Sequence, residues 1–148
     1  MTPTASEHQV SARVQVSFDA ADPPSLARFW ALALGYVEQP PPPGYDTWDA
    51  WADEQGVPAE ERDGFAALVD PAGRGPRLLF QRVPEAKSAK NRVHLDVTVS
   101  GPDHDRALVD ARVRELEAAG GRVLADRSER GERWVVMADP EGNELCVQ

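Results

Sequence analysis

The chain has 148 residues and a formal net charge of -9, and this length suffices for one compact domain with a core and a pocket. Its 25 acidic residues outnumber 16 Lys and Arg, which excludes a binder of the nucleic-acid backbone, because such a protein needs a basic surface. The chain has one cysteine, which excludes an internal disulfide. Because the sequence shows neither a recognisable leader nor an apolar stretch of roughly 20 residues, we expect a cytoplasmic protein with no membrane contact.

The first predicted elements are a strand and a helix. Apolar and polar residues alternate in ARVQVSFDA, residues 12–20, as in a half-buried strand. Residues 22–35 then predict a helix, because Asp22 suits the N-cap, prolines follow it in the first turn, and Gly35 suits the C-terminal cap. Phe29 and Trp30 lie on the apolar stripe of this helix, so burial in the core is a sufficient explanation for both.

Residues 40–63 interrupt this pattern and are interpreted as an insertion. PPPPG at 40–44 cannot continue a helix or a central strand, and the following segment predicts a short helix that ends at Gly56. Trp48 and Trp51 share a face of that helix, where they either pack on the sheet or cover a pocket. Strands resume in GFAALVD and PRLLFQRV, and residues 83–91 read as a polar linker.

The second half repeats the organisation of the first. RVHLDVTV at 92–99 matches RVQVSFDA, a helix is predicted from about Pro102 to Ala119, and three candidate strands follow in GRVLAD, ERWVVMAD and GNELCVQ. The turns DPAG and DPEG also align. We therefore predict one α+β domain over residues 1–148, made of two βαβββ repeats at about 12–82 and 92–148.

Several short motifs resemble the vicinal oxygen chelate superfamily, which contains glyoxalases and bleomycin-resistance proteins. They are FW at 29–30 with LG at 34–35, DPAG in the first repeat, and DPEGN before the last strand. The chain is most similar to the glyoxalase-like domains common in actinobacterial genomes. The resemblance implies two curved half-barrels around a cleft that holds a metal or a small molecule. The half-barrels pair either within one chain or across a dimer, and the sequence leaves this open. We expect a homodimer.

The resemblance also implies metal ligands on the first and fourth strands of each repeat. Gln15 and His94 occupy the first-strand positions, whereas Leu79 and Cys146 occupy the fourth-strand positions. Leucine cannot bind a metal, so the aligned site is incomplete, although a register shift of two would bring in Gln81. Zinc, nickel, manganese or iron could suit such donors, but we expect no cofactor. The metal candidates are Gln15, His94, Cys146 and Glu144.

Glu144 has two interpretations that the sequence leaves open. It either forms a proton-transfer pair with His94, with the carboxyl pKa raised by an apolar cleft, or an ion pair with Arg77 that holds the repeats together. Solvated roles are expected for His8 in the N-terminal tail and for His104 at the start of a polar helix.

Two function classes follow. The first is a binding module whose cleft captures a small, partly aromatic metabolite or drug without a complete metal site. The second is a divalent-metal-dependent lyase, isomerase or dioxygenase in which His94 and Glu144 are catalytic. The predicted ligand-binding residues are Gln15, Trp30, Trp48, Trp51, Arg77, Gln81, His94, Trp134 and Glu144.

Overall fold

The computed structural model describes residues 11–148, and therefore does not include His8. Two four-stranded sheets form, with strand orders β1-β4-β3-β2 and β5-β8-β7-β6. In each sheet the first strand of the unit runs parallel to the last one, and the other pairs are antiparallel. The predicted α+β fold of two repeated βαβββ units is confirmed. Within residues 11–148, no helix has the length and apolar character needed to cross a membrane.

The N-terminal unit begins as its sequence signals predict. The Asp22 side chain accepts a hydrogen bond from the Ser25 amide, and Gly35 ends the helix in the left-handed conformation at φ 68, which glycine adopts without steric cost. The second strand is only two residues long and was not predicted, because a stretch this short shows no alternation. The elements are β1 (Gln15–Ala20), α1 (Pro23–Leu34), β2 (Val37–Glu38), β3 (Phe65–Val69) and β4 (Arg77–Arg82).

The C-terminal unit differs from its prediction at the start of the helix. The helix begins at Arg106 and not near Pro102, because Asp105 is the N-cap and accepts a hydrogen bond from the Ala107 amide. His104 therefore lies in the preceding turn, with a left-handed φ of 51. The elements are β5 (Leu95–Val97), α3 (Arg106–Ala118), β6 (Arg122–Glu129), β7 (Glu132–Ala138) and β8 (Glu144–Val147).

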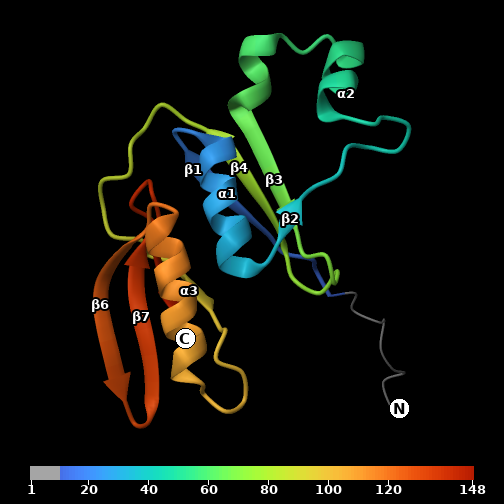
Figure 1. Cartoon of the computed structure of the whole chain (residues 1–148). Helices are drawn as coiled ribbons and strands as arrows, with labels where there is room; N and C mark the ends of the chain where they lie inside the picture. The colour runs from blue at the N-terminus through green and yellow to red at the C-terminus, as the bar shows by residue number, and fades with distance from the viewer. Residues whose placement is uncertain (1–10) are drawn as a thin grey trace, which may run out of the picture.

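The insertion forms α2 (Trp48–Gln55) and the 3-10 helix η1 (Ala59–Gly64). Figure 1 shows α2 standing away from α1 and from the sheets. Arg62 links the two helices, since it forms ion pairs with Asp49 and Asp53 and donates to the Val57 carbonyl. The insertion is therefore held together largely by its own contacts.

The two units are joined through their helices and through one buried carboxylate. Helices α1 and α3 lie side by side and in contact (Figure 1). Asp139, in the turn before β8, is 1% exposed and accepts a hydrogen bond from the indole of Trp30 at 3.0 Å. The aromatic pair in the first repeat is thus anchored to the DPEGN turn of the second repeat.

Candidate functional site

Each sheet packs one face against the helices and leaves the other face open. Along β5, β7 and β8 the buried residues alternate with less buried ones, and side chains two apart on a strand share a face. Strand pairing aligns the less buried positions of these three strands. Three further residues directly adjoin the strand ends, and among them His94, predicted inside a strand over 92–99, precedes β5. We call the whole set the open face of the C-terminal sheet: His94, Asp96, Thr98, Glu132, Trp134, Val136, Glu144, Cys146 and Gln148.

The middle of this open face carries a cluster of three possible metal ligands: His94, Asp96 and Cys146. One donor atom from each lies within 4.8 Å of the donors of the other two. The Nδ1 atom of His94 is 2.7 Å from Oδ1 of Asp96. Because an ionised carboxylate only accepts hydrogen bonds, Nδ1 carries the proton and Nε2 is the free ring nitrogen.

The cluster keeps Cys146 in its thiol form. Burial, followed by the charge of Asp96 and a hydrogen bond to it, raises the pKa of the Cys146 thiol to about 11. A half-buried thiol beside a carboxylate is a poor nucleophile, because the thiolate is the reactive form. Asp96 therefore links the histidine and the cysteine, since both lie against its carboxylate.

The structure gives Glu144 other partners than the sequence suggested. Its carboxylate forms an ion pair with Lys87 at 3.1 Å and accepts the Asn91 amide hydrogen bond at 3.0 Å. Partial burial alone would raise the pKa of this carboxyl, but the Asn91 and Lys87 contacts outweigh it and the pKa lies below its ordinary value. The prediction of a raised pKa, as a proton-transfer pair requires, is therefore wrong. The predicted ion pair with Arg77 is also wrong, because Glu144 pairs with Lys87.

Arg77 belongs to a separate network on the N-terminal sheet. It donates to the side chains of Gln39 and Gln15, and the indole of Trp48 donates to the Gln39 carbonyl at 2.8 Å. These hydrogen bonds connect the insertion to β1 and engage the amide oxygen of Gln15. Gln81 is likewise engaged, because its amide donates to Asp19 at 2.8 Å.

The repeat-related positions of the two sheets carry different chemistry. Ser17 pairs with Leu79 in the N-terminal sheet, as Asp96 pairs with Cys146 in the C-terminal sheet. A leucine and a serine thus stand where the second repeat has a thiol and a carboxylate. The ligand cluster within the described residues is confined to the C-terminal unit.

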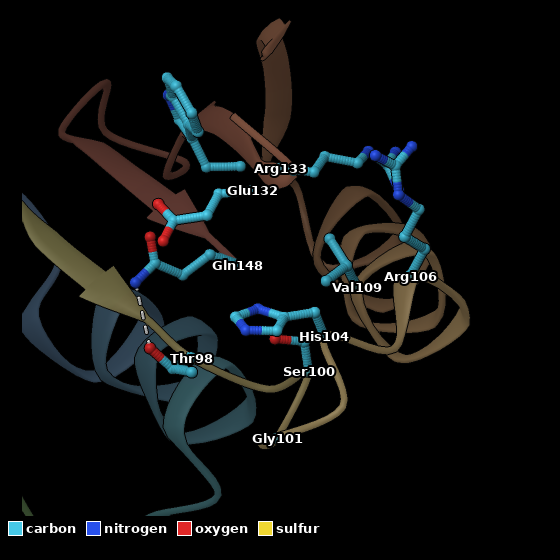
Figure 2. Close-up of a pocket in the computed structure, with 11 residues that line it drawn as sticks. Thr98, Ser100, Gly101, His104, Arg106, Val109, Glu132, Arg133 and Gln148 are labelled. Carbon is cyan, nitrogen blue, oxygen red and sulfur yellow. Dashed lines mark hydrogen bonds between the residues drawn. The ribbon is translucent and has the colours of Figure 1, made fainter. Parts of the chain in front are cut away.

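Two pockets border the open face of the C-terminal sheet. One, of about 290 Å³, lies between β1 and β5, and the predicted residues Trp30, His94 and Glu144 line it together with Asp19. The other, of about 140 Å³, is lined by Trp134 and by residues of the turn before α3 (Figure 2). The structure therefore brings three predicted residues to one pocket and a fourth to its neighbour.

The other predicted ligand-binding residues line neither pocket. Gln15, Arg77 and Gln81 lie on the N-terminal sheet, and Trp48 and Trp51 belong to the insertion. The two indoles pack against each other edge to face, with centroids 5.5 Å apart. In the single chain they contribute to the packing of the insertion.

Sequence reasoning missed Asp96 as a member of the site. The signal was present in the segment HLD, because residues two apart on a strand point to the same side. Alignment of the two repeats pairs His94 with Gln15, which is a possible ligand, but it pairs Asp96 with Ser17, which does not indicate a site.

The residues of the cluster fit a divalent ion by donor type. Imidazole nitrogen, carboxylate oxygen and thiolate sulfur are all zinc ligands, and three protein ligands leave a position for substrate. His94, Asp96 and Cys146 would hold the ion. Of the other metal candidates, Gln15 is bound to Arg77 and Glu144 to Lys87.

Comparison with known proteins gives one family and many similar folds. A model of the glyoxalase-like domain matches residues 15–148, and no curated protein matches significantly. The chain is similar to a glyoxalase/bleomycin resistance protein/dioxygenase family enzyme from Burkholderia phytofirmans PsJN, at 17% identity and a TM-score of 0.57, covering 90% of this chain and 94% of that chain.

Two similar structures contain ligands. One is the bleomycin-binding protein from Streptomyces verticillus with copper(II)-bleomycin, at 18% identity and a TM-score of 0.53, covering 94% of this chain and 96% of that one. The other is a mutant of the fosfomycin resistance protein FosX from Listeria monocytogenes with Mn(II) and a dihydroxypropylphosphonic acid. The identity is 12% and the TM-score 0.61, and the match covers 95% of this chain and 90% of that chain. At these identities the likeness establishes the fold.

Proposed function

The chain belongs to the glyoxalase-like domain family of the vicinal oxygen chelate superfamily, and from this premise we propose that it binds a small, partly aromatic metabolite or drug. The observation that carries the proposal is the open face of the C-terminal sheet, where polar side chains converge beside two pockets. Sites for small molecules combine such concavities with a few convergent polar groups. A cytoplasmic location stays a prediction from the sequence.

We propose that His94 and Asp96 orient the ligand. Asp96 holds the histidine ring through Nδ1 and leaves Nε2 to contact the bound molecule. Glu144 keeps its charge, because its pKa lies below the ordinary value, and acts as a hydrogen-bond acceptor. Trp30 contributes an aromatic edge to the pocket while its indole nitrogen stays bound to Asp139.

The proposal is tested by screening small aromatic phenols, carboxylates and amines for changes in tryptophan emission. For a compound that binds, we expect His94→Ala and Asp96→Asn each to weaken binding about tenfold, the effect of losing a directional polar contact. Asp46→Asn, which changes an exposed residue of the insertion, should leave the affinity within about twofold. Equal affinities of all three variants for every compound would contradict the proposal.

The cluster of His94, Asp96 and Cys146 favours a second candidate function, that of a divalent-metal-dependent lyase, isomerase or dioxygenase. A bound divalent ion would polarise a substrate oxygen. Elemental analysis of protein purified without a histidine tag, after incubation with zinc, nickel, manganese and iron, separates the two candidates. Stoichiometric metal that is lost in His94→Ala would favour the enzyme, whereas no uptake of any of these ions would exclude it.

We also propose that the protein is a homodimer, because the open face of the N-terminal sheet exposes apolar groups. Phe65 is 63% exposed, and its pairing with Gln81 places it on the same face as Leu79 and Ala67. Exposed apolar faces of this kind mark interaction surfaces. We expect Phe65→Asp to convert a dimer into a monomer in analytical ultracentrifugation at micromolar concentration.

The control for this experiment is Leu108→Asp, which places the same charge on an exposed apolar residue of α3, 48% exposed. It should leave the dimer intact. A wild-type protein that sediments as a monomer would contradict the proposed dimer directly.

A further inference from the structure

We infer that the pocket at the far end of the C-terminal sheet binds a protonated amine, so that the ligand belongs to the class of amine-bearing small molecules. The inference rests on the proposed binding function, because it names the chemical class of that ligand. The pocket, of about 140 Å³, lies where β5, β7 and β8 approach the turn before α3 (Figure 2).

Two oxygen acceptors line this pocket, one from Gln148 and one from Glu132. The Gln148 amide nitrogen donates to Thr98 Oγ1 at 3.2 Å, so the amide oxygen is directed the other way. Figure 2 shows this end of Gln148 and the carboxylate of Glu132 pointing toward the same part of the pocket. A carboxylate and an amide oxygen cannot hydrogen-bond each other, since both only accept. A donor between them would satisfy both, and an ammonium group offers three N–H donors.

The charges near the pocket leave the carboxylate of Glu132 available. Across residues 11–148, no ion pair within 4 Å involves Glu132. Its neighbour Arg133 points to the helix side of the sheet, where it pairs with Asp110 and Asp126 at 2.8 Å each. The guanidinium of Arg106 lies near Arg133, across the pocket from Glu132 (Figure 2). Glu132 is thus the carboxylate side chain among the residues that line the pocket, and Arg106, which also has no ion pair within 4 Å among the described residues, lies on the opposite side.

Trp134 adds an aromatic wall to the same pocket. A cation over an aromatic ring gains electrostatic attraction from the ring, and tryptophan is the strongest partner for it. The net charge of -9 also raises the local concentration of cations around the protein. An aromatic side chain, a carboxylate and an amide oxygen together select an ammonium over a neutral or anionic group.

The pocket lies beyond the ligand cluster along the sheet. Thr98 and Gln148, which line the pocket, directly follow the ends of β5 and β8, and each lies two positions after a cluster residue, Asp96 or Cys146. Two residues of a strand extend about 6.6 Å. Glu132 is four residues from Val136, the cross-strand partner of Cys146, which corresponds to about 13 Å along the strand. A ligand whose amine binds at Glu132 therefore reaches the cluster with a group about 13 Å away, which describes an amine separated by a longer spacer from a polar or aromatic end.

The test uses 2-phenylethylamine and its neutral counterpart 2-phenylethanol as probes, with binding followed by the NMR signal of the Trp134 indole N–H. We expect the amine to bind at least about tenfold more tightly than the alcohol, and Glu132→Gln to remove most of that difference. The matched control is Glu129→Gln, because Glu129 is the cross-strand partner of Glu132 and its substitution changes the net charge equally. Glu129→Gln should leave the affinity for the amine within about twofold.

Equal affinities for the amine and the alcohol, or equal effects of Glu132→Gln and Glu129→Gln, would overturn the inference. A different result is expected if only the proposed function fails. The amine would then still bind and depend on Glu132, but substitution of His94 or Asp96 would not weaken the binding of any compound. His94→Ala is therefore measured in parallel, and amine binding that depends on Glu132 and survives in His94→Ala supports the inference alone.

Discussion

Asp139→Ala is expected to lower the free energy of unfolding by about 3–5 kcal/mol, because it leaves several buried donors without a partner. The carboxylate is 1% exposed and accepts hydrogen bonds from the Trp30 indole, from the Asn143 amide and side chain, and from the Glu141 amide at 2.8–3.0 Å. For a domain of this size the loss corresponds to a melting temperature lower by roughly 10 °C. Denaturant titration followed by circular dichroism measures it.

Asp70→Ala is the matched control, because Asp70 occupies the repeat-related turn of the first unit. Its side chain accepts only from amides of its own turn, those of Ala72, Arg74 and Gly75, and holds no side chain of the other unit. We therefore expect a clearly smaller loss of stability. Equal losses of unfolding free energy in the two variants would show that the effect comes from the turn alone. This result would contradict the role of Asp139 in joining the units.

Cys146 is expected to react with iodoacetamide roughly a hundredfold more slowly at neutral pH than a thiol with the ordinary pKa, because only the thiolate reacts. Burial and the charge of Asp96 raise its pKa to about 11 from 9.0. Because a raised pKa shifts thiolate formation to higher pH, the rate should increase about tenfold per pH unit and level off only near pH 11. The measurement is the alkylation rate by mass spectrometry as a function of pH.

Asp96→Asn removes the negative charge beside the thiol and should therefore speed alkylation several-fold at neutral pH, although burial would keep the pKa above its ordinary value. Glu144→Gln is the control, since Glu144 stands two residues from Cys146 on the same face without contributing to its raised pKa. A rate that levels off below pH 9, or identical rates in both variants, would contradict the arrangement of the cluster.

The elements of the fold were largely predictable from short stretches of sequence. Alternation identified β1, capping residues identified α1, and the repeated turns identified the duplication. The errors were also local in origin. Pro102 suits the first turn of a helix and so predicts the start of α3 too early, whereas the N-cap of the helix is Asp105.

The candidate site was less predictable, because its contacts join residues far apart in the sequence. Lys87 lies in the segment that the sequence predicts to be a polar linker, and nothing near it in the chain indicates that it pairs with Glu144. Asp96 and Cys146 lie next to each other only through the parallel pairing of β5 with β8. His94 was identified by its place in the repeat, whereas its partner Asp96 was not.

The sequence by itself determined the class of fold and the two repeats, and it placed His94 within one residue of the first strand of the second repeat, because alternation, caps and turns act between near neighbours. The tertiary structure decided which side chains meet: the Trp30 indole with Asp139, and Glu144 with Lys87. The physical reason is that strand register and the path of the linker select partners among many polar groups of equal local propensity. Those partners then set charge and pKa at the site.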